Sequence, residues 1–280
     1  FLVRPGAHNA AYWSVSLPYQ MLFFQRWFAR NAPQAAAPAK GLRVVFMGDS
    51  ITDGNWGKAD GKPSSERNLW DRNHLYGSGY MYLCATYYQS SFPDRDYRFF
   101  NRGVGGHALS DLAARWQEDV LDLRPDVLSV FIGTNDVERH LRKLLRADDP
   151  QAVPDFDFAA WEKTYRGLLD KAREANPALE IVLCTPFAAP CGKIVEGALG
   201  AYYPLRQRML AQCCEVVERI AADYGATLVP FHRLIAGLES RLPNGDATYW
   251  VWDGIHPTPA GQRRMADCWI GTVARSGAME

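Results

Sequence analysis

The 280-residue sequence has neither an excess of one charge nor a long apolar run, and both absences exclude classes of protein. Lys and Arg together number 31, and Asp and Glu together also number 31. A neutral chain gives no electrostatic reason to expect nucleic acid or an anionic membrane as a partner. No apolar run approaches the roughly 20 residues that span a bilayer. We therefore expect a soluble protein with the cytoplasm as the favoured compartment, and export stays open because the sequence begins at Phe1.

Metal-ligating residues are also sparse. The six cysteines are too few for a disulfide scaffold in a chain of this length, and they form no CxxC pair. We expect Cys84, Cys184 and Cys268, which lie in apolar runs, to be buried free thiols. The six histidines include no HxxxH pair. The sequence therefore predicts no bound metal and no cofactor.

The composition changes near residue 41. Residues 1–31 are rich in aromatic side chains, and residues 31–41 (NAPQAAAPAKG) have the alanine and proline content of a linker. Residues 17–30 fit an amphipathic helix, and they fit equally an arm that packs on the body or on a neighbouring subunit of a homo-oligomer. We predict an arm and linker over residues 1–40 and one domain over residues 41–280.

Strand and helix patterns alternate through that domain. Runs with strand character occur at 43–47, 97–101, 127–132, 181–185 and 227–231. Helical patterns separate them at 80–90, 109–121, 158–175, 205–224 and 259–273, with Ser110 as the expected cap of the second. Strands that are apolar on both faces are typical of a parallel sheet covered by helices. The alternation predicts a three-layer α/β/α sandwich, and the polar residues 55–73 predict a long loop.

A serine follows the first predicted strand, in the segment 48–52 (GDSIT). In open α/β sheets, ligands bind at the carboxyl ends of the strands, so Ser50 is a candidate nucleophile. The alternative is a turn in which Ser50 only caps a helix. For Asp49 and Asp53 we expect turn and capping roles, not metal binding.

A carboxylate precedes a histidine by three residues in the segment 252–257 (WDGIHP). In one tight turn, Asp253 can accept a hydrogen bond from one imidazole nitrogen of His256. The other nitrogen is then free to take a proton from a serine. The alternative is a turn-forming aspartate beside a surface histidine.

Two more segments end predicted strands, at 101–106 (NRGVGG) and 133–136 (GTND). A glycine N–H and the Asn135 amide suit an oxyanion hole, which needs donors where negative charge develops. The alternative is that the glycines only permit turns and that Asn135 only caps a loop. Together the four segments supply a nucleophile, two oxyanion donors and an Asp–His pair, which are the parts of a serine hydrolase.

These segments, in this order, resemble the blocks of the SGNH (GDSL) hydrolase family over about residues 42–273. The resemblance implies a flavodoxin-like sheet of five parallel strands in the order 2-1-3-4-5. It also implies Ser50 as nucleophile, His256 as base and Asp253 as the residue that orients the histidine.

The same resemblance implies three oxyanion donors, which are the backbone N–H groups of Ser50 and Gly106 and the side chain of Asn135. Gly106 is preferred to Gly105 because the family's glycine lies five residues after the asparagine, here Asn101.

Further segments resemble the intracellular bacterial acetyl xylan esterases in particular. They are 77–83 (GSGYMYL), 101–137, 183–187 (LCTPF) and 252–262 (WDGIHPTPAGQ). This similarity implies removal of an O-acetyl group from a carbohydrate such as xylan or a xylo-oligosaccharide through an acyl-enzyme. The loop over 55–73 and the N-terminal extension depart from the family pattern and leave the substrate open.

Three aromatic residues near these segments are candidates for substrate binding. His107 follows Gly106, and Trp250 and Trp252 flank Asp253. The tryptophans suit an aromatic wall for a sugar ring or acyl group, and they suit apolar core equally. Three alternative functions remain. The first is a lipase, lysophospholipase or thioesterase that acts on another ester. The second is an acyltransferase that uses a sugar acceptor, and the third is an inactive carbohydrate-binding module.

Overall fold

The computed structural model of the protein describes residues 21, 41–56 and 75–280. The predicted arm and linker, apart from Met21, and most of the predicted loop over 55–73 lie outside the described residues. The division of the chain near residue 41 therefore stays a prediction. In the part that is described, no helix has the length and apolar character that a membrane span requires.

Five parallel strands form one sheet in the order β2-β1-β3-β4-β5, which confirms the predicted order. The strands are β1 (Arg43–Gly48), β2 (Arg98–Gly103), β3 (Val127–Phe131), β4 (Glu180–Cys184) and β5 (Thr227–Val229). The last strand is shorter than predicted because Pro230, which has no N–H for a strand ladder, follows it and Phe231 begins a helix.

The central position of β1 determines where the loops of the site meet. In the strand register, Gly48 at the end of β1 lies opposite Gly103 of β2 and Phe131 of β3. The segments after these three strands therefore begin side by side at one edge of the sheet. This edge is the switch point of the topology, where open α/β sheets bind their ligands.

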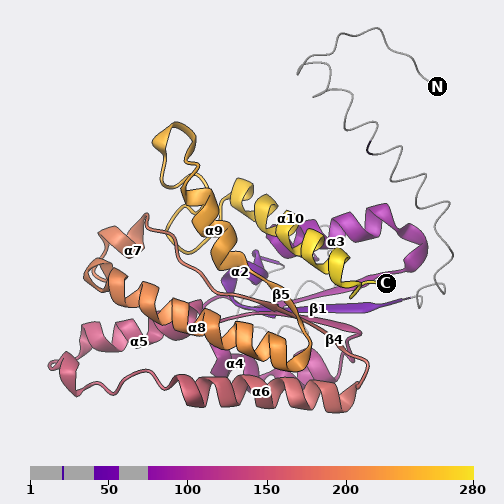
Figure 1. Ribbon diagram of the computed structural model, residues 1–280, viewed down its shortest axis with the longest axis horizontal. Coiled ribbons are helices and arrows are strands. Elements are labelled where there is room, and N and C mark those ends of the chain that lie inside the picture. The colour runs from indigo at the N-terminus through magenta and orange to yellow at the C-terminus, as the bar shows by residue number, and fades with distance from the viewer. Residues whose placement is uncertain (1–20, 22–40, 57–74) are drawn as a thin grey trace, which may run out of the picture. The chain divides into compact units, whose positions relative to one another are not determined.

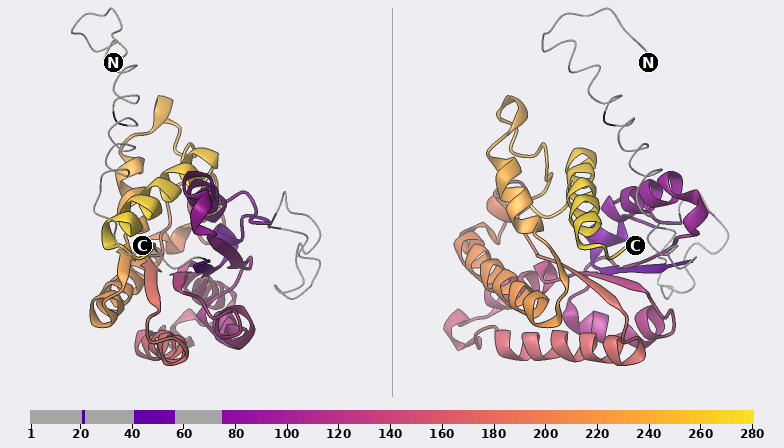
Figure 2. Two further views of the ribbon diagram at one scale, coloured as in Figure 1. Left: turned by 90° about the vertical axis from the view of Figure 1, so that its right-hand side faces the viewer. Right: turned by 45° about the vertical axis from the view of Figure 1, so that its right-hand side comes forward.

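Helices cover both faces of the sheet and complete the predicted three-layer α/β/α sandwich. The longer helices are α3 (Tyr80–Ser91), α5 (Thr134–Arg146), α6 (Phe158–Ala175), α8 (Tyr203–Tyr224), α9 (Phe231–Glu239) and α10 (Pro259–Ser276), and the shorter ones are α2 (Ser50–Asp53), α4 (Leu109–Ala114) and α7 (Lys193–Glu196). Figures 1 and 2 show α3, α9 and α10 on one face and α4, α5, α6 and α8 on the other.

Two helical predictions need correction. The expected helix over 109–121 is divided into α4 and a π-helical turn at Gln117–Leu121. Ser110 does not cap α4, because Ala108 is the N-cap residue and its N–H donates to the Asp111 carboxylate at 2.8 Å. Helix α9 was not predicted.

The strands form the centre of the core. All five residues of β3 are buried, and Phe46 of β1 packs on Trp269 of α10 with ring centroids 4.9 Å apart. Cys84 and Cys184 are buried free thiols as predicted, whereas Cys268 is only partly buried. The apolar strands thus hold the sheet rigidly beneath the loops at its carboxyl edge.

Candidate active site

A single helical turn places Ser50 at the end of β1. Asp49 is the N-cap residue of α2, and its Oδ1 accepts the backbone N–H of Ile51 at 3.0 Å, which is the capping role expected for it. The turn is close-packed, since a Cβ on Gly48 would lie 2.8 Å from the carbonyl oxygen of Phe131. Helix α2 ends after one turn at Gly54, whose φ of 53° lies in the left-handed region.

Ser50, His256 and Asp253 form a continuous hydrogen-bonded chain. The Oγ of Ser50 lies 2.8 Å from Nε2 of His256, and Nδ1 of His256 lies 2.8 Å from Oδ2 of Asp253. The other carboxylate oxygen of Asp253 accepts the backbone N–H groups of Ile255 at 3.0 Å and of His256 at 2.7 Å. The turn predicted from the Asp-x-x-His spacing therefore orients the imidazole toward the serine.

Asp253 is 2% exposed, yet its contacts favour the ionised carboxylate. Burial raises the pKa of Asp253, but hydrogen bonds from His256, Lys193 and Ile255 together hold this pKa well below its usual value. The Nζ of Lys193 lies 2.6 Å from Oδ2, the same oxygen that faces the imidazole. No sequence pattern pointed to Lys193, because the contact depends on how α7 packs beside the turn.

Hydrogen bonding distinguishes the two neighbouring glycines of the loop after β2. The N–H of Gly105 donates to Oδ2 of Asp53 at 2.9 Å. The N–H of Gly106 donates to no acceptor among the residues that the structure describes. A Cβ on Gly106 would have no neighbour within 4 Å, so space adjoins it. Of the two, Gly106 has the backbone N–H available to a ligand.

The Asn135 side chain lies between this loop and the turn that holds Ser50. Its Nδ2 donates to the carbonyl oxygen of His107 at 3.0 Å and lies 3.4 Å from Oδ2 of Asp49. Burial raises the pKa of Asp49 to about 7, against the opposing effect of the hydrogen bond from Ile51. One amide hydrogen of Asn135 is therefore bonded to His107, and the other faces Asp49 only at the long distance of 3.4 Å.

Asn101 braces the turn that holds Ser50, a role that sequence reasoning missed. The buried Nδ2 donates to the carbonyl oxygens of Thr52 at 3.0 Å, Asp53 at 3.1 Å and Tyr76 at 3.0 Å. Its Oδ1 accepts the N–H of Gly103 at 2.9 Å. The sequence indicated Asn101 only as the start of a motif, and its position at the end of the predicted strand over 97–101 was the one available signal.

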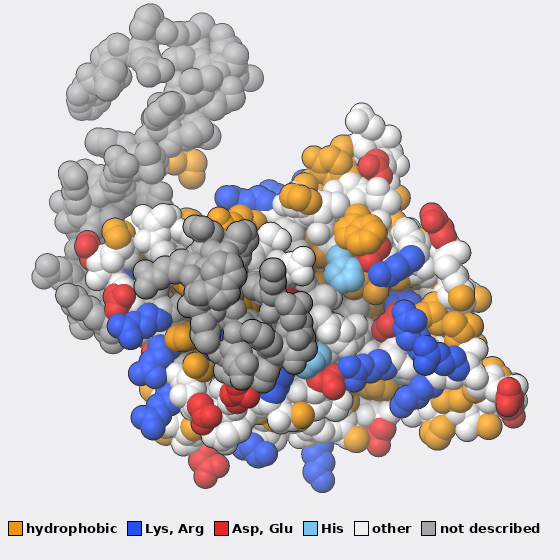
Figure 3. Space-filling view, turned by 180° about the vertical axis from the view of Figure 1, so that it is seen from behind, with side chains coloured by type: hydrophobic (Ala, Val, Ile, Leu, Met, Phe, Trp, Pro, Cys, Tyr) orange, Lys and Arg blue, Asp and Glu red, His pale blue; other side chains and the backbone are white. Residues whose placement is uncertain are grey.

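The three candidate substrate-binding residues have different environments. Trp252 is 57% exposed, and its ring lies at 25° to that of His256 with centroids 6.3 Å apart. Trp250 is partly buried, and its indole N–H donates to the carbonyl oxygen of Arg241 at 3.0 Å. His107 is also partly buried. Figure 3 shows a surface histidine beside an exposed hydrophobic side chain and basic side chains on this face.

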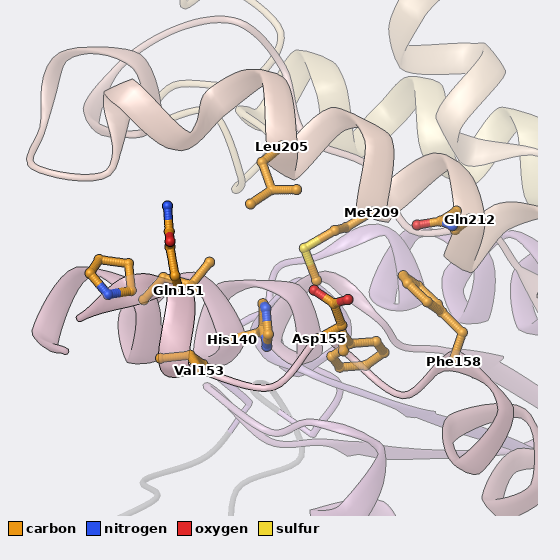
Figure 4. Close-up of a pocket in the computed structure, with 11 residues that line it drawn as sticks. His140, Gln151, Val153, Asp155, Phe158, Leu205, Met209 and Gln212 are labelled. Atoms are coloured by element: carbon orange, nitrogen blue, oxygen red, sulfur yellow. The ribbon is translucent and has the colours of Figure 1, made fainter.

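A separate cavity of about 510 Å³ lies among α5, α6 and α8. Figure 4 shows His140 of α5, Met209 of α8 and Asp155 of the segment between α5 and α6 in its wall. None of Ser50, Asp253 and His256 lines it. This cavity is therefore distinct from the hydrogen-bonded chain at the strand ends.

Comparison with known proteins gives consistent matches. The model of the GDSL-like lipase/acylhydrolase family matches residues 46–264. The chain is 30% identical to an acetylxylan esterase of Geobacillus stearothermophilus over 234 residues, which are 83% of this chain and 94% of that protein. The crystal structure of Axe2, an acetylxylan esterase of the same organism, has a TM-score of 0.66 and 26% identity, covering 84% of this chain and 95% of that one. The crystal structure of LAE5, an alpha/beta hydrolase enzyme from the Lake Arreo metagenome, has a TM-score of 0.66 and 29% identity. The match covers 86% of this chain and 98% of that one.

Proposed function

Since the chain belongs to the GDSL-like lipase/acylhydrolase family and is a carboxylic ester hydrolase, we propose that it removes an O-acetyl group from a carbohydrate such as xylan or a xylo-oligosaccharide. The observation that carries the proposal is the hydrogen-bonded chain from Ser50 through His256 to Asp253. It contains the nucleophile, the base and the orienting carboxylate that acyl transfer requires.

In the first step, Oγ of Ser50 attacks the carbonyl carbon of the ester while Nε2 of His256 takes the hydroxyl proton. The ionised Asp253 stabilises the imidazolium that results. The bond between the carbonyl carbon and the sugar oxygen then breaks, and His256 gives its proton to the departing sugar hydroxyl. The acyl group is left on Ser50.

In the second step, a water molecule gives a proton to His256 and attacks the acyl carbon. The bond to Oγ of Ser50 breaks, the proton returns to the serine, and acetate leaves. In both steps the tetrahedral intermediate carries a negative oxygen. We assign its stabilisation to the N–H groups of Ser50 and Gly106 and to the amide of Asn135.

Two features support a carbohydrate as the leaving group. The exposed ring of Trp252 beside His256 provides a flat apolar face of the kind on which sugar rings stack. Catalytic mutants of Axe2, the acetylxylan esterase, replace a serine, an aspartate or a histidine, and its aspartate precedes its histidine by three residues. Asp253 and His256 have the same spacing. We assign sugar stacking to Trp252 and a structural role to Trp250.

Acetate release from acetylated xylan by the wild type and by Ser50→Ala tests the proposal, with p-nitrophenyl acetate and an octanoyl ester as comparison substrates. We expect release from xylan that the substitution abolishes. Cleavage of the octanoyl ester in preference to both acetyl esters would contradict an acetyl specificity. Cleavage of p-nitrophenyl acetate alone would retain the serine mechanism and exclude xylan as the substrate.

A further inference from the structure

The guanidinium group of Arg115 ties together the segments that surround Ser50. Arg115 follows α4, and its Nη2 donates to the carbonyl oxygen of Gly48 at 3.2 Å. Its Nη1 donates to the carbonyl oxygen of Arg102 at 2.7 Å and to the carboxylate of Asp119 at 2.5 Å. The third nitrogen, Nε, donates to Nδ1 of His107 at 3.2 Å. One side chain thus contacts the ends of β1 and β2 and the loop that contains Gly106.

The contact with Arg115 determines where His107 carries its proton. A guanidinium group has only donors and stays charged, so Nδ1 of His107 must be the acceptor. A neutral imidazole with Nδ1 as acceptor has its proton on Nε2. Burial and the charge of Arg115 lower the pKa of His107, with a smaller effect of the same sign from Arg139 and opposing effects from Asp111 and Asp119.

His107 lies at the centre of the proposed oxyanion site. It follows Gly106, and its carbonyl oxygen accepts Nδ2 of Asn135 at 3.0 Å. Arg139 fixes the preceding peptide by donating to the carbonyl oxygen of Gly106 at 2.7 Å. The Nε2 of His107 has no hydrogen-bond partner in the part of the chain that the structure describes. His107 is only partly buried.

We propose that Arg115 is a positioning residue that holds His107 as a neutral imidazole with its proton on Nε2, and that this N–H donates a hydrogen bond to an oxygen of the departing carbohydrate. The inference rests on the proposed function, because it requires a sugar leaving group. A lysine at position 115 would keep the charge but would lack the directed contacts that the three guanidinium nitrogens make.

Long-range ¹H–¹⁵N NMR of histidine-labelled protein tests the first half of the proposal. In the wild type we expect an unprotonated Nδ1 and a protonated Nε2 for His107 at neutral pH. In Arg115→Lys we expect a mixture of both tautomers. The signals of His107 are assigned as those that are missing from the spectrum of His107→Gln. A protonated Nδ1 in the wild type, or an unchanged tautomer in Arg115→Lys, would overturn the role of Arg115.

Kinetics on two esters test the second half. A net hydrogen bond contributes about 0.5–1.5 kcal/mol, so His107→Ala should lower kcat/KM for an acetylated xylo-oligosaccharide roughly 3- to 10-fold. Hydrolysis of p-nitrophenyl acetate, which has no sugar, should change less than about twofold on the same reasoning. His107→Gln, whose amide N–H reaches a position near Nε2, should restore most of the loss. The matched control is His140→Ala, which alters a partly buried histidine of α5 and should change neither rate.

Equal losses on both esters in His107→Ala would show that the ring only supports the loop, and this would overturn the inference. No rescue by His107→Gln would overturn the donor role. Failure of the proposed function has a different signature. In that case the wild type would cleave p-nitrophenyl acetate through Ser50 but not the sugar ester, while the NMR result would still decide the pairing of Arg115 with His107.

Discussion

Asp49 is an ionisable residue whose side chain has almost no access to water. Its contribution to the free energy of unfolding therefore depends on pH. Its pKa is raised from 3.8 to about 7, chiefly by burial. Between these values the folded protein keeps a proton that the unfolded chain releases. The free energy of unfolding therefore falls as the pH rises through this window.

Asp49→Asn should remove that pH dependence, because an amide cannot ionise and still accepts the N–H of Ile51. From pH 5 to pH 8 we expect the wild type to lose about 3 kcal/mol relative to the variant, since two pKa units correspond to this free energy. Urea denaturation at the two pH values measures it. A stability difference between the two proteins that is the same at pH 5 and pH 8 would show that Asp49 does not titrate in this range.

Asn135 makes the second prediction at the scale of the residue. Asn135→Ala should lower kcat on the order of 10²–10³-fold, because one donor to the oxyanion is lost. The fold should be unaffected, since among the described residues the amide nitrogen donates to the carbonyl oxygen of His107 and, at 3.4 Å, approaches Asp49. Steady-state kinetics with thermal melts provides both readouts.

Asn176→Ala is the matched control. Asn176 directly follows α6, and its amide donates to the carbonyl oxygen of Pro125, away from the site. We expect this variant to lose stability and to retain kcat. A variant at position 135 with more than about a tenth of wild-type kcat would be inconsistent with its role as an oxyanion donor.

At the scale of the element, the position of Ser50 depends on how closely α2 packs on the end of β2. A Cβ on Gly103 would lie 2.2 Å from the backbone nitrogen of Asp53. Gly103→Ala should therefore displace α2 and destabilise the protein by about 1–3 kcal/mol, as overpacking does, with a loss of kcat.

Gly167→Ala serves as the matched substitution. Gly167 lies within α6, and a Cβ there would meet nothing within 4 Å. Because glycine is unfavourable within a helix, we expect this variant to be more stable by up to about 1 kcal/mol, with unchanged kcat. Urea denaturation measures the free energy of unfolding of both variants. A change of the same sign in Gly103→Ala and Gly167→Ala would refute the packing argument.

The elements also show what local pattern can and cannot predict. The strands were predicted because runs such as Val127–Phe131 are buried on both faces and therefore almost entirely apolar. Helix α9 was missed because it begins directly after Pro230, where the pattern suggested a continuing strand. The break between α4 and the π-helical turn was missed because both halves keep a helical sequence pattern.

At the scale of the molecule, the sheet order brings distant segments together. Strand β1 lies between β2 and β3, so the loops that hold Ser50, Gly106 and Asn135 leave the same edge. Four short motifs in their chain order were enough to predict this convergence and the Asp–His turn. The roles of Asn101, Lys193 and Arg115 were not predictable, because each depends on side-chain contacts between segments far apart in the sequence.

We propose Ser50 as the nucleophile of the folded triad, and covalent labelling with a fluorophosphonate followed by peptide mass spectrometry tests this assignment. We predict one label, on Ser50, in the wild type, strongly slowed labelling in His256→Ala, and none at this site in Ser50→Ala. An acetylated xylo-oligosaccharide should compete with the label. A wild type that stays unlabelled while folded, or that is labelled equally fast without His256, would contradict the account.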